Sequence, residues 1–383
     1  MKTYDTVILG AGSVGVPLAY FCARRGMSVL VLDKEPSWGR GQNRAAIGGI
    51  RATHSDPGKI TIGLESLEII RNLKEEHGLN VEWRQGGYLF VAYDAEKEQA
   101  FRDLLEVQKA TGLDIDWISP DRVRDLAPGI NLEGLRGGTY SPSDGFASPL
   151  MTSTAFHKLA LDAGAEFRFG ETVTDFRMAG RRIRAVRTDA GQYAAETFVN
   201  AAGAEAAAIG NLAGLELPVH PDLHEAGVTE PVRRFMEPMI VDMRCDSQSG
   251  NYYFYQTGTG QVVFCITPRP QIWGTVTDST SDFLPLCVRR MVEIYPRLRN
   301  LKVRRTWRGC YPMTPDGLPI VGKVMEPENL LLAVGMCGQG FMLGPGLGRI
   351  LSSVIAGEDA GLHREVYEEL TLYRKFEGLE LLK

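Results

Sequence analysis

The sequence predicts an α/β protein in which a doubly wound domain is discontinuous and holds an inserted α+β domain built on an antiparallel sheet. Three observations predict this fold class. A strand, a glycine loop, a helix and a second strand follow one another within residues 5–33. Another strand leads into a glycine loop and a helix within residues 330–348. Between them, residues 217–308 are rich in aromatic residues and β-runs, so the two ends complete one domain around an insertion.

The opening unit has the spacing of a Rossmann-like dinucleotide-binding βαβ unit. Its strand is followed at once by Gly10-Ala11-Gly12-Ser13-Val14-Gly15. Gly10 permits the tight turn, Gly12 lets the backbone approach a pyrophosphate, and Gly15 lets the helix pack closely on the strand. Asp33 ends the second strand, about 20 residues past the last glycine, where a carboxylate accepts hydrogen bonds from ribose hydroxyls and disfavours a 2′-phosphate.

The remaining elements follow from periodicity and from turn residues. Residues 39–51 are too polar for a core and too rich in glycine for a helix, which suits backbone lying against a flat ligand. Helices are predicted over residues 59–77, 95–110, 150–163 and 282–295, with a short one from Ser119, and strands over 87–92, 165–169, 183–188, 197–201, 251–256 and 261–266. We expect residues 1–50, 146–214 and 309–383 to form the nucleotide-binding domain, and 51–145 and 215–308 the substrate-binding domain.

Composition excludes several functional classes. The 383 residues carry a net charge of −5 without a long basic run, which argues against a nucleic-acid surface. The six cysteines form no close pair, so we expect no disulfide framework and no metal site. No apolar run approaches the ~18 residues of a membrane span. The first strand begins by residue 5, which leaves no room for a signal peptide, and we expect a cytoplasmic protein.

The second glycine loop completes the cofactor prediction. It reads Gly335-Met336-Cys337-Gly338-Gln339-Gly340-Phe341 and lies between a strand and a helix. A nucleotide held at one end of the chain, with a second loop closing from the other end, favours a flavin enzyme. A helix N-terminus near the flavin pyrimidine would stabilise the negative charge of the reduced ring and raise its reduction potential. Pro345 suits the first helical turn, and Gly344 and Gly346 would let backbone N–H groups approach the ring.

Four segments resemble the FAD-dependent amine and amino-acid oxidoreductases, or DAO family, typified by glycine oxidase, sarcosine oxidase and D-amino-acid dehydrogenase. They are residues 39–51, 200–203, 307–322 and 335–348. The resemblance covers nearly the whole chain and implies a GR2-type flavoprotein fold. Residues 48–51, 85–90 and 305–307 most resemble the β subunit of heteromeric L-proline dehydrogenase and related opine- or cyanide-forming dehydrogenases. This implies a partner subunit that carries electron-transfer centres.

The resemblance also implies which residues hold the FAD. Gln339 stands where the family commonly has His. This difference would shift the reduction potential of the flavin without loss of the flavin. Gly309 occupies the place at which sarcosine oxidase attaches its flavin, with Cys310 one residue away, so we expect FAD to be bound without a covalent link. The expected cofactor residues are Gly10, Gly12, Ser13, Val14, Gly15, Asp33, Lys34, Arg40, Gln42, Asn43, Arg44, Ala46, Ile47, Gly48, Gly49, Val173, Ala201, Ala202, Gly203, Gly309, Tyr311, Gly335, Gly338, Gln339, Gly340, Phe341 and Met342.

Candidate substrate residues follow from the same resemblance. Arg51 occupies a motif position at which sarcosine oxidase has an arginine, and guanidinium–carboxylate pairing is strong where water is excluded. Tyr311 replaces an arginine of glycine oxidase, and Met342 a lysine of sarcosine oxidase. Tyr253 and Tyr255 share one face of their strand, so these hydroxyls and that of Tyr311 are candidate donors in place of the missing cations. His224 is a further candidate to hydrogen-bond substrate.

These residues predict an FAD-dependent dehydrogenase. It would oxidise the C–N bond of a proline-, sarcosine- or glycine-like amino acid by hydride transfer to flavin N5, giving an imine. Sarcosine oxidase has a lysine beside the flavin for reaction with oxygen, and that position falls near Phe264 by approximate alignment. Lys158 is the only lysine between residues 110 and 300, which favours an acceptor other than oxygen. Three alternatives stay open: a peroxide-releasing oxidase, a 2-hydroxy-acid dehydrogenase, and a flavin subunit of an electron-transfer assembly.

Overall fold

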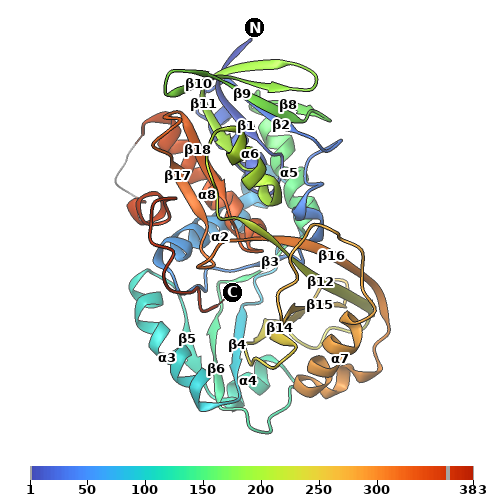
Figure 1. Ribbon diagram of the computed structural model, residues 1–383. Coiled ribbons are helices and arrows are strands. Elements are labelled where there is room, and N and C mark those ends of the chain that lie inside the picture. Colours follow the sequence, from blue (N-terminus) through green and yellow to red (C-terminus); the bar gives the residue numbers. More distant parts are fainter. Residues whose placement is uncertain (1, 359–362, 383) are drawn as a thin grey trace.

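A computed structural model describes residues 2–358 and 363–382 of the chain. Two eight-stranded sheets lie at opposite ends of the molecule (Figure 1). The first sheet has the strand order β17-β18-β11-β1-β2-β8, and a hairpin of β9 and β10 extends from β11. Its strands are β1 (Thr3–Leu9), β2 (Val29–Asp33), β8 (Glu166–Phe169), β9 (Val173–Ala179), β10 (Arg182–Thr188), β11 (Gln192–Asn200), β17 (Ile320–Lys323) and β18 (Leu330–Val334).

The centre of this sheet is parallel, as the βαβ pattern predicts. β1 pairs in parallel with both β2 and β11, and β11 pairs in parallel with β18. The helices that cover the sheet are α1 (Gly15–Arg24), α5 (Pro149–Asp162), α6 (Ala206–Leu212) and α8 (Gly340–Ala356), and α2 (Pro57–His77) lies against α8. Because parallel strands end at the same edge, the first glycine loop, the loop after β11 and the loop after β18 meet there.

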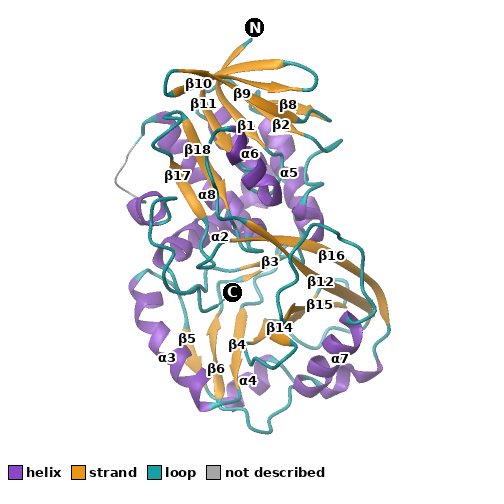
Figure 2. Ribbon diagram, viewed as in Figure 1, coloured by secondary structure: helices purple, strands orange, loops and turns teal. Residues whose placement is uncertain are grey.

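The second sheet is mostly antiparallel, with the order β16-β12-β15-β14-β13-β4-β6-β5. Its helices lie on its outer side, as Figure 2 shows with helices in purple and strands in orange. The strands are β4 (Tyr88–Ala92), β5 (Asp116–Ile118), β6 (Gly137–Ser141), β12 (His220–Pro231), β13 (Met239–Asp242), β14 (Ser249–Gln256), β15 (Gln261–Pro268) and β16 (Val303–Met313), and the helices are α3 (Ala95–Ala110), α4 (Pro120–Leu126) and α7 (Phe283–Ile294). The predicted fold class is confirmed.

Helix termini follow the local sequence. Asp56 caps α2 by accepting a hydrogen bond from the Lys59 N–H (2.9 Å), and Gly78 ends the helix in the left-handed conformation. The sequence missed β9, whose residues are mostly exposed and therefore lack a strong apolar alternation. The sequence analysis also assigned α2 to the substrate-binding domain. In the structure α2 packs on α8, within the hydrophobic cluster that covers one face of the first sheet.

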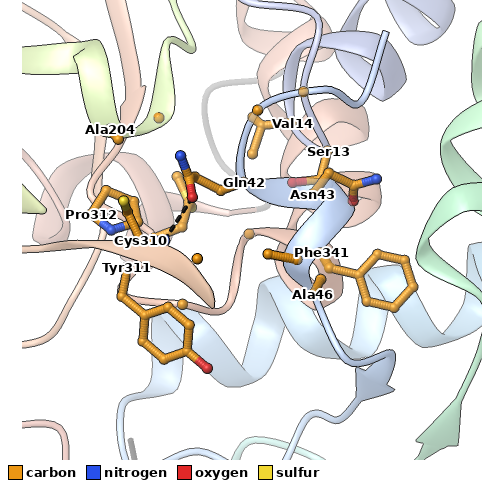
Figure 3. Close-up of a pocket in the computed structure, with 18 of the residues that line it drawn as sticks. Ser13, Val14, Gln42, Asn43, Ala46, Ala204, Cys310, Tyr311, Pro312 and Phe341 are labelled. Carbon is orange, nitrogen blue, oxygen red and sulfur yellow. Dashed lines mark hydrogen bonds between the residues drawn. The ribbon is translucent and has the colours of Figure 1, made fainter. Parts of the chain in front are cut away.

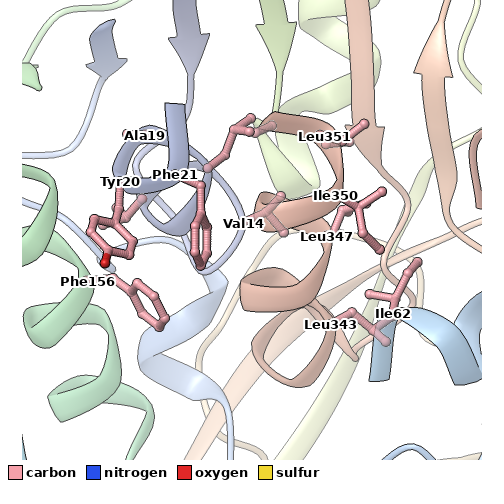
Figure 4. Packing of buried hydrophobic residues seen from close by; sticks show 14 of the residues in the cluster. Val14, Ala19, Tyr20, Phe21, Ile62, Phe156, Leu343, Leu347, Ile350 and Leu351 are labelled. Carbon is pink, nitrogen blue, oxygen red and sulfur yellow. The ribbon is translucent and has the colours of Figure 1, made fainter. Parts of the chain in front are cut away.

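Helix α8 packs tightly between α1 and α2 (Figure 4). A Cβ at Gly344 would collide with the Ser13 carbonyl, and one at Gly346 with the carbonyl of Ile62. These two glycines therefore allow helices to approach, which corrects the expectation that they bring N–H groups to a flavin. Pro345 lies inside α8 rather than in its first turn. No helix in the described ranges is long and apolar enough to cross a membrane.

Candidate functional site

A cavity of about 670 Å³ lies between the two sheets (Figure 3). Its first half is bounded by three backbone segments: the loop after β1, the stretch 40–49, and the loop after β18. Its second half is bounded by side chains of the second sheet, of the segment after Ile50 and of the chain end, including Arg51, Tyr88, Tyr253 and Leu382. We call these the loop half and the side-chain half.

The loop half begins at the carboxyl ends of the parallel strands. Gly10 has a φ of +112°, and a Cβ there would lie 2.5 Å from the Ala201 carbonyl oxygen. Asp33 accepts hydrogen bonds from the N–H of Ala11 (2.6 Å) and of Glu35 (2.8 Å), and it also lines the cavity. Since a carboxylate has about four acceptor sites, Asp33 can still accept from a ligand. Burial raises the pKa of Asp33.

The stretch 40–49 is attached to the second sheet. It contains a 3₁₀ turn, η1 (Gln42–Ala45). Gln42 Oε1 accepts from the Cys310 N–H at 2.7 Å, as drawn in Figure 3. The Trp307 indole donates to the Ala45 carbonyl at 2.9 Å. Tyr255 donates its hydroxyl hydrogen to the Ile47 carbonyl. Strands β14 and β16 therefore fix the position of a segment that sequence analysis placed against a ligand.

The loop after β18 brings the start of α8 to the cavity. Gly338 has a φ of +80°, and the Tyr311 ring occupies the place that a Cβ there would take. Gly340, Phe341 and Met342 line the cavity at the first turn of α8. The first N–H groups of a helix have no partner within the helix, and they favour negative charge nearby. This end of the cavity therefore suits an anionic or electron-rich group.

Two features of the loop half indicate a ligand with polar edges. A Cβ at Gly12 would meet no protein atom within 4 Å, so this glycine exposes backbone to the cavity rather than to a neighbouring chain segment. Asn43 Oδ1 and Gln339 Oε1 are buried, and neither has a hydrogen-bond partner among the described residues. Because buried polar atoms are normally paired, these two acceptors fit a bound molecule that donates to them.

Arg51 is a buried cation of the side-chain half. It is buried, with its guanidinium 5.4 Å from the centre of the Phe90 ring. Nη1 donates to the Thr53 carbonyl and to Nδ1 of His54 (3.1 Å), and Nη2 donates to the Leu382 carbonyl. A guanidinium has five donors, so two remain for a ligand. Burial lowers the pKa of Arg51, and nearby acidic groups oppose that shift.

Two tyrosines meet beside Arg51 in the cavity wall. The hydroxyls of Tyr253, on β14, and Tyr311, on β16, lie 2.7 Å apart. Burial raises the pKa of both hydroxyls well above the usual range. Both therefore stay protonated at neutral pH. The Cys265 thiol also lies within hydrogen-bonding reach of both hydroxyls, so a ligand would share the second hydrogen of the pair with this thiol.

Two predicted substrate residues lie behind the wall instead. His224 stacks on the Tyr311 ring with centroids 3.8 Å apart, and its Nε2 lies 3.1 Å from Asp222 Oδ2. It is absent from the described cavity lining, as is Tyr255, which packs on Phe146. Both expectations of direct contact are corrected: these side chains support Tyr311 and the 40–49 stretch.

Two further expectations are corrected by position. Gly15 is absent from the described lining, and a Cβ there would collide with the Gly10 carbonyl, so its role is helix packing. Phe264 is fully buried in the core of the second sheet, where it stacks on Phe283 at 6.0 Å, and so it does not mark a position beside the cavity. All other predicted cofactor residues line the cavity.

Sequence reasoning missed several lining residues of the side-chain half. They are Tyr88, Phe90, Val241, Met243, Asn251, Thr267 and Leu382. Tyr88 and Phe90 lie in a predicted strand, and the alternation of that strand would have placed them on one face. Leu382 gives no comparable signal, because it lies in a short tail without periodicity.

Comparison with known proteins gives consistent matches. A family model described as DAO, FAD dependent oxidoreductase, matches residues 5–354. The mitochondrial sarcosine dehydrogenase of Mus musculus is 27% identical over 366 residues, which cover 92% of this chain and 39% of that protein. The sarcosine oxidase subunit beta of Arthrobacter sp is 28% identical over 373 residues, covering 94% of this chain and 88% of that subunit.

A solved structure extends the match to three dimensions. L-proline dehydrogenase from P. horikoshii has a TM-score of 0.90 and 30% sequence identity, and the match covers 97% of each chain. This chain therefore has the length of the proline dehydrogenase chain, whereas it spans well under half of the mitochondrial sarcosine dehydrogenase.

Proposed function

The chain belongs to the DAO family of FAD-dependent oxidoreductases, and we propose that it is a dehydrogenase that oxidises the C–N bond of a small amino acid to an imine. The family resemblance drawn from the sequence is thereby confirmed, and FAD is the cofactor. The observation that carries the proposal is the side-chain half of the cavity, where Arg51 and the Tyr253–Tyr311 pair provide donors for one carboxylate.

The residues of the loop half fit FAD. Gly12 would present backbone to the pyrophosphate, and Asp33 would accept from the ribose hydroxyls. The first turn of α8 would face the pyrimidine end of the ring, with the amide of Gln339 close to it. We propose that FAD is held without a covalent bond. Acid precipitation of the protein should then leave the yellow colour in the supernatant.

The bound FAD supplies the hydride acceptor, at its N5 atom. The chain's own residues supply position and exclude water. Arg51 and one tyrosine hydroxyl would bind the substrate carboxylate, because a charge-assisted pair is strong in a site closed from solvent. Tyr88, Phe90 and Leu382 would surround the carbon and nitrogen substituents. We assign no side chain as a general base.

A proline-, sarcosine- or glycine-like substrate fits this arrangement best. The relatives named for sarcosine and proline act on small N-substituted or cyclic amino acids. The aromatic wall of the side-chain half suits such an apolar ring or N-methyl group next to a carboxylate. A glycine-like primary amine would make the same carboxylate contacts with less apolar burial.

We propose an electron acceptor other than oxygen. Lys34, beside Asp33, is the only lysine in the described lining, so none of the described side-chain half provides an ammonium. A partner subunit carrying electron-transfer centres would take the electrons, since one relative is named as a subunit. Hydrogen peroxide formed at the rate of turnover would favour the oxidase instead.

The test is anaerobic reduction of the flavin. Holoenzyme is mixed with L-proline, D-proline, sarcosine, glycine, an opine and 2-hydroxyglutarate, and the visible flavin band is followed. Fast bleaching by one amino acid and slow recolouring in air support the proposal. Bleaching by the hydroxy acid alone would support a hydroxy-acid dehydrogenase. A yellow protein that no substrate bleaches would contradict the enzyme proposal and favour the electron-transfer subunit.

A further inference from the structure

The end of the chain enters the substrate side of the cavity. After α8 the chain passes the first sheet, and residues 380–382 lie between the two sheets, close to β3 (Gly49–Ile50) (Figure 1). Arg374 fixes this path by donating to Asp316 at 2.8 and 3.0 Å and to the Leu318 carbonyl at 3.0 Å. Residues 380–382, which we call the tail, therefore arrive beside Arg51 from a defined direction.

The tail is held by a buried ion pair. Lys59 Nζ, at the start of α2, lies 3.1 Å from Glu380 Oε2, and both side chains have 0% exposure. Glu380 Oε1 also accepts from the N–H of Ser55 (3.0 Å) and from that of Leu382 (3.1 Å). The Leu381 N–H donates to Ser55 Oγ at 3.0 Å. Removing two charges from water costs free energy, so such a pair adds little to the stability of the fold. Its effect is to fix the position of the tail.

This anchoring leaves Leu382 with two contacts in the cavity. Its carbonyl accepts a hydrogen bond from Arg51 Nη2. Its side chain is 3% exposed and packs with Tyr88, Phe90 and Val241 in one apolar cluster. The preceding Leu381 is 56% exposed. One leucine is thus placed in the cavity wall while its neighbour points to solvent.

We propose that Leu382, which the tail holds in the cavity wall, is a specificity-determining residue of the substrate site. The Leu382 side chain closes the apolar wall that faces the substituents of the substrate, and its carbonyl fixes the orientation of the Arg51 guanidinium. Glu380 and Lys59 act as positioning residues through this contact. The inference rests on the proposed function, because it takes the Arg51 end of the cavity as the site of the substrate carboxylate.

A pair of leucine variants tests the wall. Leu382→Ala should raise KM for the preferred small amino acid about tenfold with little change in kcat, since a pocket distinguishes one or two methylenes by about 10- to 200-fold. It should also improve the relative kcat/KM of a larger analogue, such as pipecolate against proline or N-ethylglycine against sarcosine. Leu381→Ala is the matched control and should keep every value within twofold. Equal selectivity in the two variants would overturn the inference.

A second set of variants tests the anchor. Glu380→Gln leaves Lys59 buried without its charged partner, so we expect the tail to leave its position and Arg51 to lose its hydrogen bond to the Leu382 carbonyl. The probe is benzoate, a carboxylate without an oxidisable C–N bond, which should then bind about tenfold more weakly. Binding is read from the flavin absorption spectrum, which requires no turnover. Glu377→Gln, an exposed change in the same segment, is the control. If Glu380→Gln does not fold, the double variant Lys59→Met/Glu380→Leu keeps the tail docked by apolar contact and should bind benzoate within threefold of wild type.

The outcomes separate this inference from the proposed function. If an amino acid reduces the wild-type flavin but Leu382→Ala behaves like Leu381→Ala, the tail inference is wrong and the proposed function stands. If no amino acid reduces the flavin but benzoate binding weakens in Leu382→Ala alone, the proposed function is wrong and the tail still borders an anion site. If wild type does not bind benzoate, or if the double variant binds it as weakly as Glu380→Gln, the inference is overturned.

Discussion

The two halves of the cavity are built by different means. The loop half consists of glycines and backbone groups, most of them at the ends of neighbouring parallel strands, and each of its segments is a short continuous run of the chain, although the runs come from both ends of the sequence. The side-chain half joins Arg51, Tyr88, Tyr253, Tyr311 and Leu382, which come from distant segments of the chain. The difference teaches that cofactor binding depends on local backbone conformation, whereas substrate recognition depends on how distant elements pack.

The comparison of the two halves predicts that the largest effect of a substitution is at Gly10, on FAD binding. Gly10→Ala places a Cβ 2.5 Å from the Ala201 carbonyl and at a φ of +112°, so the turn must move and FAD binding should be lost. The measurement is the ratio of flavin to protein absorbance after purification, with the melting temperature. Gly26→Ala is the control, because Gly26 also has a positive φ but open space around it. That change should cost about 1 kcal/mol of stability and keep FAD. Full flavin content in Gly10→Ala would contradict the prediction.

In the side-chain half the largest effect is expected at Arg51. Arg51→Met removes the cation that would bind the carboxylate, and we expect kcat/KM to fall about 1000-fold, or about 4 kcal/mol, as for truncation of a buried charge pair. Flavin content should be unchanged, because the loop half is intact. Steady-state kinetics and the flavin spectrum measure the two effects. Arg184→Met, an exposed change, is the control. A loss of FAD in Arg51→Met would show that the two halves are not independent.

A smaller effect is expected at the tyrosine pair. Tyr253→Phe and Tyr311→Phe should each lower kcat/KM about 10- to 100-fold, because a hydrogen bond to a charged group contributes about 1.5–3 kcal/mol. The double variant should lose less than the sum of the two, since the hydroxyls act as a pair.

Tyr252→Phe is the control for this pair. The Tyr252 hydroxyl is buried and has no hydrogen-bond partner among the described residues. Its removal should leave kcat/KM unchanged and raise the free energy of unfolding by about 1 kcal/mol. Additive losses in the pair, or a kinetic effect of Tyr252→Phe, would contradict this interpretation.

A last effect, on stability rather than on catalysis, concerns pH and Asp144, which supports the segment after Arg51. Asp144 is buried and accepts from the Ala52 N–H (2.9 Å) and the Thr53 hydroxyl (2.6 Å). Burial raises the pKa of Asp144 from 3.8 to about 6. Because the folded state then holds its proton to higher pH than the unfolded state does, this group lowers the free energy of unfolding by up to about 3 kcal/mol as pH rises from 4 to 6.

Urea unfolding at several pH values measures this contribution. Asp144→Asn cannot titrate, so its free energy of unfolding should increase relative to that of wild type as the pH rises from about 4 to 6. The comparison uses the difference between the two slopes, which is independent of the hydrogen bonds that the amide changes. Identical slopes would show that Asp144 does not titrate in this range.

Much of the fold was predictable from particular residues. Asp56 and Gly78 mark the ends of α2, and the apolar run before Gly10 marks β1. These signals are local, because caps and tight turns depend on backbone conformation within a few residues. The errors at Gly344, Pro345 and His224 arose where a residue's role depends on an element that the sequence does not place beside it.

The sequence by itself determined the loop half: a strand, a turn and a helix place Gly10, Gly12 and Asp33 locally. Only the tertiary structure decided the side-chain half. The register of β12 with β16 puts His224 behind Tyr311, and the Lys59–Glu380 pair brings Leu382 to Arg51. Such contacts join residues far apart in the sequence, and packing rather than local preference sets which of them meet.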